Sequence, residues 1–113
     1  MEKYKVGVIG GTGMVGQRFV TLLADHPWFQ LTVIAASSRS AGKTYEEAAG
    51  KRWAMDVPIP EQAKSIVVMD AQADVEKIAS LVDFVFCAVD LDKEATRALE
   101  ESYAKAECPV VSN

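Results

Sequence analysis

The sequence has 113 residues, of which 50% are hydrophobic and 25% are charged, a composition typical of soluble globular proteins. A chain of this length buries roughly 65% of the surface that its unfolded form exposes, which is enough for one hydrophobic core and excludes two separate domains. The formal net charge of -4 opposes broad attachment to nucleic acid or anionic lipid, because both partners need a sustained cationic surface.

The cysteine and histidine content excludes two further classes of protein. With 2 Cys and 1 His, the chain can form neither a disulfide framework nor a Cys/His metal cluster. The N-terminus leads directly into a strand pattern, and no apolar run approaches the length of a membrane span. We therefore expect a soluble, cytoplasmic protein that has no targeting segment and does not associate with membranes.

The first part of the chain predicts a strand, a tight turn, a helix and a second strand. Residues 4–9 form a short run with β-branched residues that ends in a glycine-rich turn at residues 10–13. A helix follows and ends near Pro27, with apolar positions at Met14, Val15, Phe19, Leu22 and Leu23. Residues 31–36 predict a second strand, parallel to the first and beside it through a right-handed crossover.

The rest of the chain continues the alternation of strands and helices. Residues 37–40 predict a polar loop, residues 44–49 a short helix, and Pro58 and Pro60 mark an exposed connection. Strands are predicted at 65–69, 83–89 and 109–113, with a helical pattern through 75–81 and a longer helix from Leu91 capped by Asp90. The order predicts an α/β fold with a Rossmann-type, doubly wound, mainly parallel sheet, truncated after its fifth strand.

The segment Gly11-x-Gly13-x-x-Gly16 has the spacing of a nucleotide-binding turn, and its place between a strand and a helix makes the pattern informative. One glycine permits the tight turn, the next lets the backbone approach a pyrophosphate, and the third lets the helix pack close to the sheet. The free amides and the positive end of the helix dipole then hold phosphate oxygens. A turn that only tightens the strand-helix connection is the alternative.

The loop after the second strand indicates which dinucleotide binds. A domain specific for NAD usually has an acid about 20 residues past the glycines to bind the ribose 2′-hydroxyl, but no acid occurs between Asp25 and Glu46. Hydroxyls and cations, which suit a 2′-phosphate, occur instead at Ser37, Ser38, Arg39, Ser40 and Lys43. The sequence therefore favours NADP over NAD, with a solvated polar loop as the alternative.

Three segments carry a family resemblance. They are Val8-Ile9-Gly10-Gly11-Thr12-Gly13-Met14-Val15-Gly16-Gln17, Ser37-Ser38-Arg39-Ser40-Ala41-Gly42-Lys43 and Pro109-Val110-Val111-Ser112-Asn113. In this order they closely resemble the N-terminal part of the aspartate-semialdehyde dehydrogenases, most of all the branch of archaea and fungi, which also has bacterial members. The loop at residues 37–43 is the more specific motif, because the glycine turn alone does not distinguish families.

The resemblance implies a reaction and a set of cofactor contacts. The reaction is NADPH-dependent reduction of L-aspartyl 4-phosphate to aspartate 4-semialdehyde and phosphate, on the route to lysine, threonine and methionine. The implied pyrophosphate contacts are Gly11, Thr12, Gly13, Met14 and Val15, and the implied 2′-phosphate contacts are Ser37, Ser38, Arg39, Ser40 and Lys43. Cys87 and Ala88 lie where the family's fourth strand passes the cofactor, although the leucine-proline pair that usually follows is absent here.

The resemblance also implies that the natural enzyme is longer. In the family, the cysteine nucleophile, the histidine acid/base and the substrate-binding arginines lie beyond the position that matches Asn113. We therefore expect residues 1–113 to be an NADP-binding domain without catalytic residues, part of a two-domain enzyme that acts on aspartyl phosphate as a homodimer or homotetramer. By itself this domain is expected to be marginally stable, because surfaces that later residues would cover stay exposed.

Cys87 lies near the carboxyl end of a predicted central strand, the side on which ligands bind in an open sheet. We interpret it as a small core residue beside the cofactor and not as a nucleophile, because the only histidine, His26, is expected at the opposite edge of the sheet. Cys108 is interpreted as a core residue in the same way. Two other functions remain open: an N-acetyl-gamma-glutamyl-phosphate reductase and a non-catalytic NADP-binding module.

Overall fold

The central sheet confirms the predicted α/β architecture. The computed structural model describes residues 3–89 and 91–112, and within them five parallel strands follow the order β3-β2-β1-β4-β5. The strands are β1 (Tyr4–Ile9), β2 (Phe29–Ala36), β3 (Met69–Asp70), β4 (Phe84–Cys87) and β5 (Val110–Ser112).

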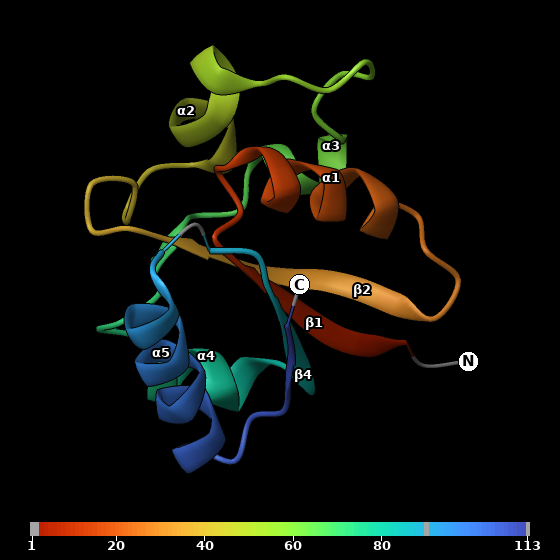
Figure 1. The fold of residues 1–113 in the computed structure, drawn as a ribbon. Helices are drawn as coiled ribbons and strands as arrows, with labels where there is room; N and C mark the ends of the chain where they lie inside the picture. The colour runs from red at the N-terminus through yellow and green to blue at the C-terminus, as the bar shows by residue number, and fades with distance from the viewer. Residues whose placement is uncertain (1–2, 90, 113) are drawn as a thin grey trace.

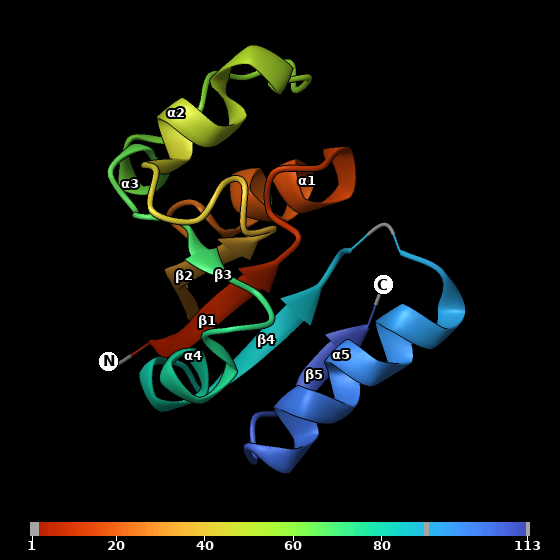
Figure 2. The ribbon, with the colours of Figure 1, turned by 90° about the vertical axis from the view of Figure 1, so that its left-hand side faces the viewer.

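Helices cover both faces of this sheet, so the fold is doubly wound (Figure 1). One face carries α1 (Met14–Leu23), α2 (Tyr45–Ala49), which continues into the 3-10 helix η1 (Gly50–Arg52), and α3 (Glu61–Lys64). The other face carries α4 (Val75–Leu81) and α5 (Lys93–Lys105), as the turned view in Figure 2 also shows. The chain changes direction between β1 and its neighbour β4, and ligands of open α/β sheets bind at the carboxyl ends of strands at such a point.

Each face of the sheet has its own hydrophobic core. On the α1 face, Val8, Val20 and Ile34 pack together with the fully buried Tyr45 of α2. On the α5 face, Val33, Ile78 and Tyr103 pack together with Cys87 and Cys108. The near-continuous apolar composition of β1 and β2 therefore follows from burial on both faces, as expected for central parallel strands.

α1 buries only part of the apolar stripe that the sequence predicted: Leu23 is buried and Phe19 packs against the core. Its buried residues are Gly16, Gln17, Val20 and Leu23. Met14, Val15 and Leu22 are exposed, with Met14 at 69%, so their assignment to the buried stripe was wrong. At Gly16 the helix packs directly against backbone atoms of Gly10 and Gly11 in the turn, where no side chain would fit, so this face of α1 lies inward.

The third strand is shorter than the predicted 65–69 and is displaced along the chain. Residues before Met69 pair with the segment that precedes α2 instead of with the sheet. The amide of Val68 donates to the Lys43 carbonyl at 2.7 Å, and the amide of Tyr45 donates to the Ile66 carbonyl at 2.8 Å. Val67 forms an isolated antiparallel bridge with Thr44, and only Met69 and Asp70 pair with β2.

The other elements differ from the predictions mainly at their ends. β2 begins at Phe29 and not at residue 31, and β4 and β5 are shorter than predicted. The helix predicted from Leu91 begins at Lys93, and its N-cap is Asp92, whose Oδ1 accepts from the Ala95 amide at 2.8 Å. Asp90, the predicted cap, lies outside the described residues, as does Asn113.

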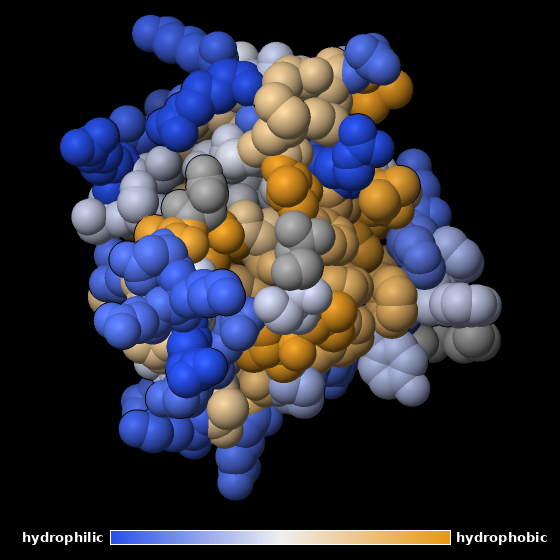
Figure 3. All heavy atoms as spheres, viewed as in Figure 1, coloured by the Kyte–Doolittle hydropathy of each residue, from blue (hydrophilic) through white to orange (hydrophobic). Residues whose placement is uncertain are grey.

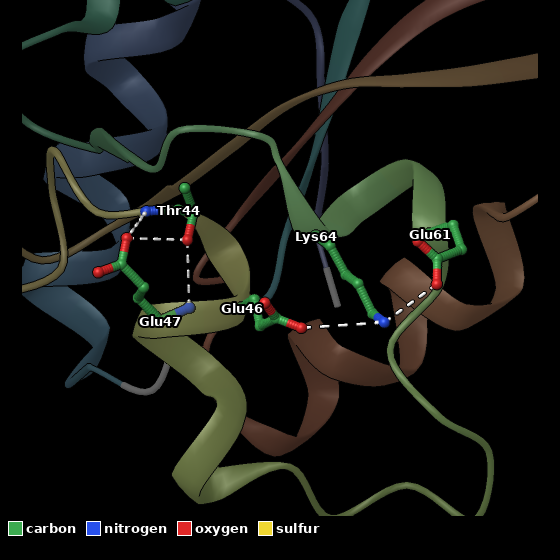
Figure 4. Close-up of polar contacts among 5 residues, drawn as sticks. All are labelled: Thr44, Glu46, Glu47, Glu61 and Lys64. Atoms are coloured by element: carbon green, nitrogen blue, oxygen red, sulfur yellow. Dashed lines mark hydrogen bonds and ion pairs between the residues drawn. The ribbon is translucent and has the colours of Figure 1, made fainter.

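The short helix α2 is held at its start by a capping box at Thr44 (Figure 4). The Thr44 Oγ1 accepts from the Glu47 amide at 3.3 Å, and Glu47 Oε1 accepts from the Thr44 amide at 3.2 Å. The hydrogen bond from the Thr44 amide lowers the pKa of the Glu47 carboxyl.

Lys64 of α3 forms ion pairs with Glu61 and, across to α2, with Glu46 at 3.8 Å. The loop at residues 37–43 therefore leads into a fixed element.

Hydrophobic residues gather over the strands at the centre of the face shown in Figure 3, whereas α5 presents hydrophilic residues there. Four half-buried aromatic rings pack against the core on the α1 face, with Phe19 stacked on Phe86 at 5.0 Å between centroids and Phe29 edge-on to Phe84 at 5.5 Å. On the edge strand β5, Val111 is 46% exposed. None of the helices in the described residues has the length and apolar character that a bilayer crossing requires.

Candidate functional site

The turn between β1 and α1 packs so closely that side chains are excluded at two of its glycines. Gly10 has a φ of +85°, and a Cβ there would lie 2.9 Å from backbone atoms of Ala88 and Val89. A Cβ at Gly16 would lie 2.1 Å from the Gly10 carbonyl oxygen. The first turn of α1 is thereby pressed against the end of β1, which accords with the predicted role of the third glycine of the motif.

Two buried side chains hold the carbonyls of this turn from inside the protein. The Tyr45 hydroxyl donates to the Gly11 carbonyl at 2.7 Å, and Gln17 Nε2 donates to the Thr12 carbonyl at 2.9 Å. Burial raises the pKa of the Tyr45 hydroxyl, so this group keeps its proton and remains a donor. The turn is therefore fixed in one conformation by groups that lie behind it.

The amino end of α1 has unsatisfied donors. Its N-cap is Gly13, with no side-chain cap and no acid in the first turn, whereas α2 and α5 are capped by Thr44 and Asp92. Among the described residues, the Met14 and Val15 amides donate no hydrogen bond to the protein. A Cβ on Gly13 would meet nothing closer than 3.9 Å, so the backbone is open to solvent at this N-cap. This arrangement is suited to an anion such as a phosphate.

A cleft of about 850 Å³ extends from this helix end across the carboxyl ends of the strands. It brings the glycine turn together with the ends of β2, β3 and β4. The lining residues are Gly10, Thr12, Gly13, Met14, Val15, Ala36, Ser37, Ser38, Arg52, Asp70, Ala71, Gln72, Ala88, Val89, Leu91 and Leu99. Met14 and Val15 were predicted to be buried but are exposed, because they lie in the wall of this cleft.

The loop after β2 contributes unequally to the cleft. Ser37 and Ser38 are exposed and line it, whereas Arg39 and Lys43 are exposed but lie outside its wall. Ser40 is only 3% exposed, and its amide donates to the Ser37 carbonyl at 3.0 Å. Ser40 thus helps to shape the loop, and the hydroxyls that it leaves open to the cleft are those of Ser37 and Ser38.

The end of β4 places Ala88 in the cleft wall but turns Cys87 away from it. Cys87 is 4% exposed within the core on the α5 face, and burial raises the pKa of its thiol, with a further contribution from the nearby Glu100 carboxylate. His26 stacks on Phe29 at the amino end of β2, while Cys87 is the last residue of β4. The thiol and the imidazole therefore lie at opposite ends of the parallel sheet, as predicted.

Several cleft residues were missed by the sequence analysis, above all Arg52 and Asp70. Asp70 ends β3, and its Oδ1 accepts from the Gln72 and Ala73 amides at 2.9 and 3.0 Å, bonds that lower the pKa of its carboxyl. The Arg52 carbonyl accepts a hydrogen bond at 3.1 Å from the side-chain amide of Gln17 in α1, and the two residues are 35 positions apart. No local spacing in the sequence signals such a contact. The described residues include no group of His, Cys, Asp or Glu placed to hold a metal ion.

Comparisons with known proteins agree with this geometry. A family model described as "Semialdehyde dehydrogenase, NAD binding domain" matches residues 5–113. The chain is 44% identical over 111 residues to an aspartate-semialdehyde dehydrogenase from Aspergillus fumigatus and 41% identical over 111 residues to one from Archaeoglobus fulgidus. These matches cover 98% of this chain but only 29% and 30% of the relatives.

A solved structure extends the similarity to the fold. The crystal structure of aspartate-semialdehyde dehydrogenase with NADP from Candida albicans superposes with a TM-score of 0.85 at 40% sequence identity. The match covers 99% of this chain and 30% of that structure's chain. The present chain thus spans less than a third of the length of the proteins that it matches.

Proposed function

Because the chain belongs to the family of semialdehyde dehydrogenase NAD-binding domains, we propose that it is the cofactor-binding part of an aspartate-semialdehyde dehydrogenase that uses NADP. One observation carries the proposal: the uncapped amino end of α1 opens into a cleft that continues to the exposed hydroxyls of Ser37 and Ser38. Free amides at one end and hydroxyls at the other would each bind one of the two phosphate-bearing parts of a dinucleotide.

The residues present fit such a cofactor. The pyrophosphate would lie against Gly11, Thr12, Gly13, Met14 and Val15, where the α1 dipole favours negative charge. The 2′-phosphate would lie against Ser37 and Ser38, with Arg39 and Lys43 supplying charge from the exposed loop and Ser40 shaping it. Ala88 would line the passage of the cofactor beside β4, with Cys87 supporting it from the core.

The chemistry of the proposed enzyme divides between this domain and a second one. When bound, the reduced cofactor would supply a hydride to the acyl carbon, which becomes an aldehyde as phosphate, or the thiolate of a thioester, leaves. The residues described here bind and orient: the α1 amides fix the phosphates, and the rigid turn sets the direction in which the rest of the dinucleotide leaves the cleft. Cys87 lies too deep in the core to act as a nucleophile, so the reacting groups are assigned to the second domain.

The proposal includes the substrate and the assembly. The substrate is L-aspartyl 4-phosphate, reduced to aspartate 4-semialdehyde in cytoplasmic amino-acid biosynthesis, and the complete enzyme is a homodimer or homotetramer assembled through its second domain. The longer protein that contains this domain is expected to reduce NADP when given aspartate semialdehyde and inorganic phosphate, measured as absorbance at 340 nm. Turnover with N-acetylglutamate semialdehyde in place of aspartate semialdehyde would assign the domain to the other reductase.

Cofactor selectivity tests the assignment of the serine-rich loop. We expect the chain to bind NADPH at least about 10-fold more tightly than NADH, because only NADPH carries the phosphate that this loop would contact. Arg39→Ala is expected to weaken NADPH binding by about 10-fold or more and to leave NADH binding nearly unchanged. Isothermal titration calorimetry measures both affinities.

A matched control for Arg39 is Arg18→Ala, which removes an exposed cation from α1 outside the loop. This variant should bind both nucleotides as the wild type does. Equal affinity of the wild-type chain for the two nucleotides, or an Arg39→Ala variant that behaves like Arg18→Ala, would contradict the 2′-phosphate assignment.

A further inference from the structure

Gln17 connects the glycine turn to a segment far along the chain. Its side chain is buried, with the residue 1% exposed, and every polar atom of its amide is used. Nε2 donates to the Thr12 carbonyl at 2.9 Å and to the Arg52 carbonyl at 3.1 Å, and Oε1 accepts from the Ala54 amide at 2.9 Å. The backbone at residues 52–54 is therefore fixed directly beside the turn.

Arg52 is the only lysine or arginine among the cleft-lining residues. It is the last residue of η1 and is exposed, and the ion pairs among the described residues involve Lys64 and not Arg52. Among the described lining residues the one acid is Asp70, which lies at the end of β3 and already accepts two backbone hydrogen bonds. Arg52, which has no ion pair within the described part of the chain, thus lines the same cleft as the amino end of α1.

We infer that Arg52 contacts the pyrophosphate of the dinucleotide and that Gln17 is the positioning residue that places it there, an inference that rests on the proposed function. A guanidinium offers a planar pair of donors to two phosphate oxygens, which the amides of a helix terminus alone do not. The pyrophosphate is assigned and not the 2′-phosphate, because Gln17 joins the Arg52 backbone to Thr12 in the turn, whereas the 2′-phosphate site lies at the end of β2.

The experiment compares Arg52→Ala with Lys51→Ala by calorimetric titration, with NADPH and with NADH, of the longer protein that contains this domain. The two variants lose the same charge from the same 3-10 helix, but Lys51 does not line the cleft. Arg52→Ala is expected to lower the affinities for NADPH and for NADH by the same factor, about 10- to 100-fold. Lys51→Ala is expected to change either affinity by less than about 2-fold, the effect of an exposed charge.

Three outcomes would overturn either the inference about Arg52 or the proposed function, and each outcome shows which of the two fails. If Arg52→Ala binds as Lys51→Ala does while the wild type binds NADPH, the inference fails and the proposed function stands. If Arg52→Ala weakens the binding of NADPH but not that of NADH, the guanidinium contacts the 2′-phosphate and the pyrophosphate assignment is wrong. If the wild-type chain binds neither nucleotide, the proposed function itself fails.

The positioning role of Gln17 has a readout that a purely structural role would not move. In a double-mutant cycle, Arg52→Ala should weaken NADPH binding several-fold less in a Gln17→Leu background than in the wild type, because the guanidinium is no longer held at the turn. An undiminished effect in that background would contradict the positioning role. Should Gln17→Leu fail to fold, the comparison of Arg52→Ala with Lys51→Ala decides the assignment of Arg52.

Discussion

Gly16→Ala is expected to lower the free energy of unfolding by about 3 kcal/mol or more, near the upper end for overpacked sites. The added Cβ would lie 2.1 Å from the Gly10 carbonyl oxygen and 2.6 Å from the Gly11 Cα, and backbone atoms cannot move aside as a flexible side chain can. For a domain of this size the loss corresponds to a fall in Tm of roughly 10–20 °C. Thermal and urea unfolding followed by circular dichroism measure it.

The matched variant is Gly13→Ala, in the same turn. Its Cβ would meet nothing closer than 3.9 Å, and its φ of -80° is accessible to alanine. The free energy of unfolding should therefore fall by no more than about 1 kcal/mol, the cost of alanine at an N-cap. NADPH binding should nevertheless fall by about 10-fold or more, because the methyl group occupies the space in front of the α1 amides. Equal free energies of unfolding for Gly16→Ala and Gly13→Ala would contradict this account of the turn.

Gln17→Leu is expected to cost about 2–4 kcal/mol of stability, although leucine has a similar volume and suits a buried position. The loss arises because the Thr12 and Arg52 carbonyls and the Ala54 amide all lose their partner, and a buried polar group without a partner costs about 1–3 kcal/mol. The Thr12 bond is buried, whereas the other two groups are partly accessible to water.

A control for Gln17→Leu is Gln30→Leu, which changes an exposed glutamine of β2. This substitution should alter the free energy of unfolding by less than about 0.5 kcal/mol, as is usual for surface positions. Urea titration of both variants gives the comparison. A Gln17→Leu variant as stable as Gln30→Leu would show that the buried amide does not hold the turn.

The elements that could be predicted from the sequence are those whose signal is local. β1, the glycine turn and the start of α1 follow one another without interruption, and the pattern of strand, glycines and helix specifies all three. The capped helix at Thr44 is equally local, since Thr44 and Glu47 satisfy each other. The parallel pairing of β2 with β1 followed from the rule for parallel crossovers, whereas the full order of the strands comes from the structure.

What could not be predicted depends on contacts between distant parts of the chain. Residues 65–68 have the composition of a strand, but they pair with residues 42–45 and leave only Met69 and Asp70 to the sheet. The buried face of α1 is set by the fit of Gly16 against the turn, which hydrophobicity does not report. Arg52 lines the cleft, and its backbone is joined to Gln17 over 35 positions of sequence, so its relation to the glycine motif is visible in the structure alone.

The hydroxyl of Tyr45 and the side-chain amide of Gln17 hold the glycine turn in its conformation before any ligand binds. Both anchor the carbonyl side of the turn in the interior, so the opposite, amide side faces outward without help from any guest molecule. Most of the conformational entropy that the backbone of an anion-binding site must lose is thus lost during folding and not on ligand binding. Association is then governed mainly by encounter and by the placement of mobile surface side chains, with little rearrangement of the main chain.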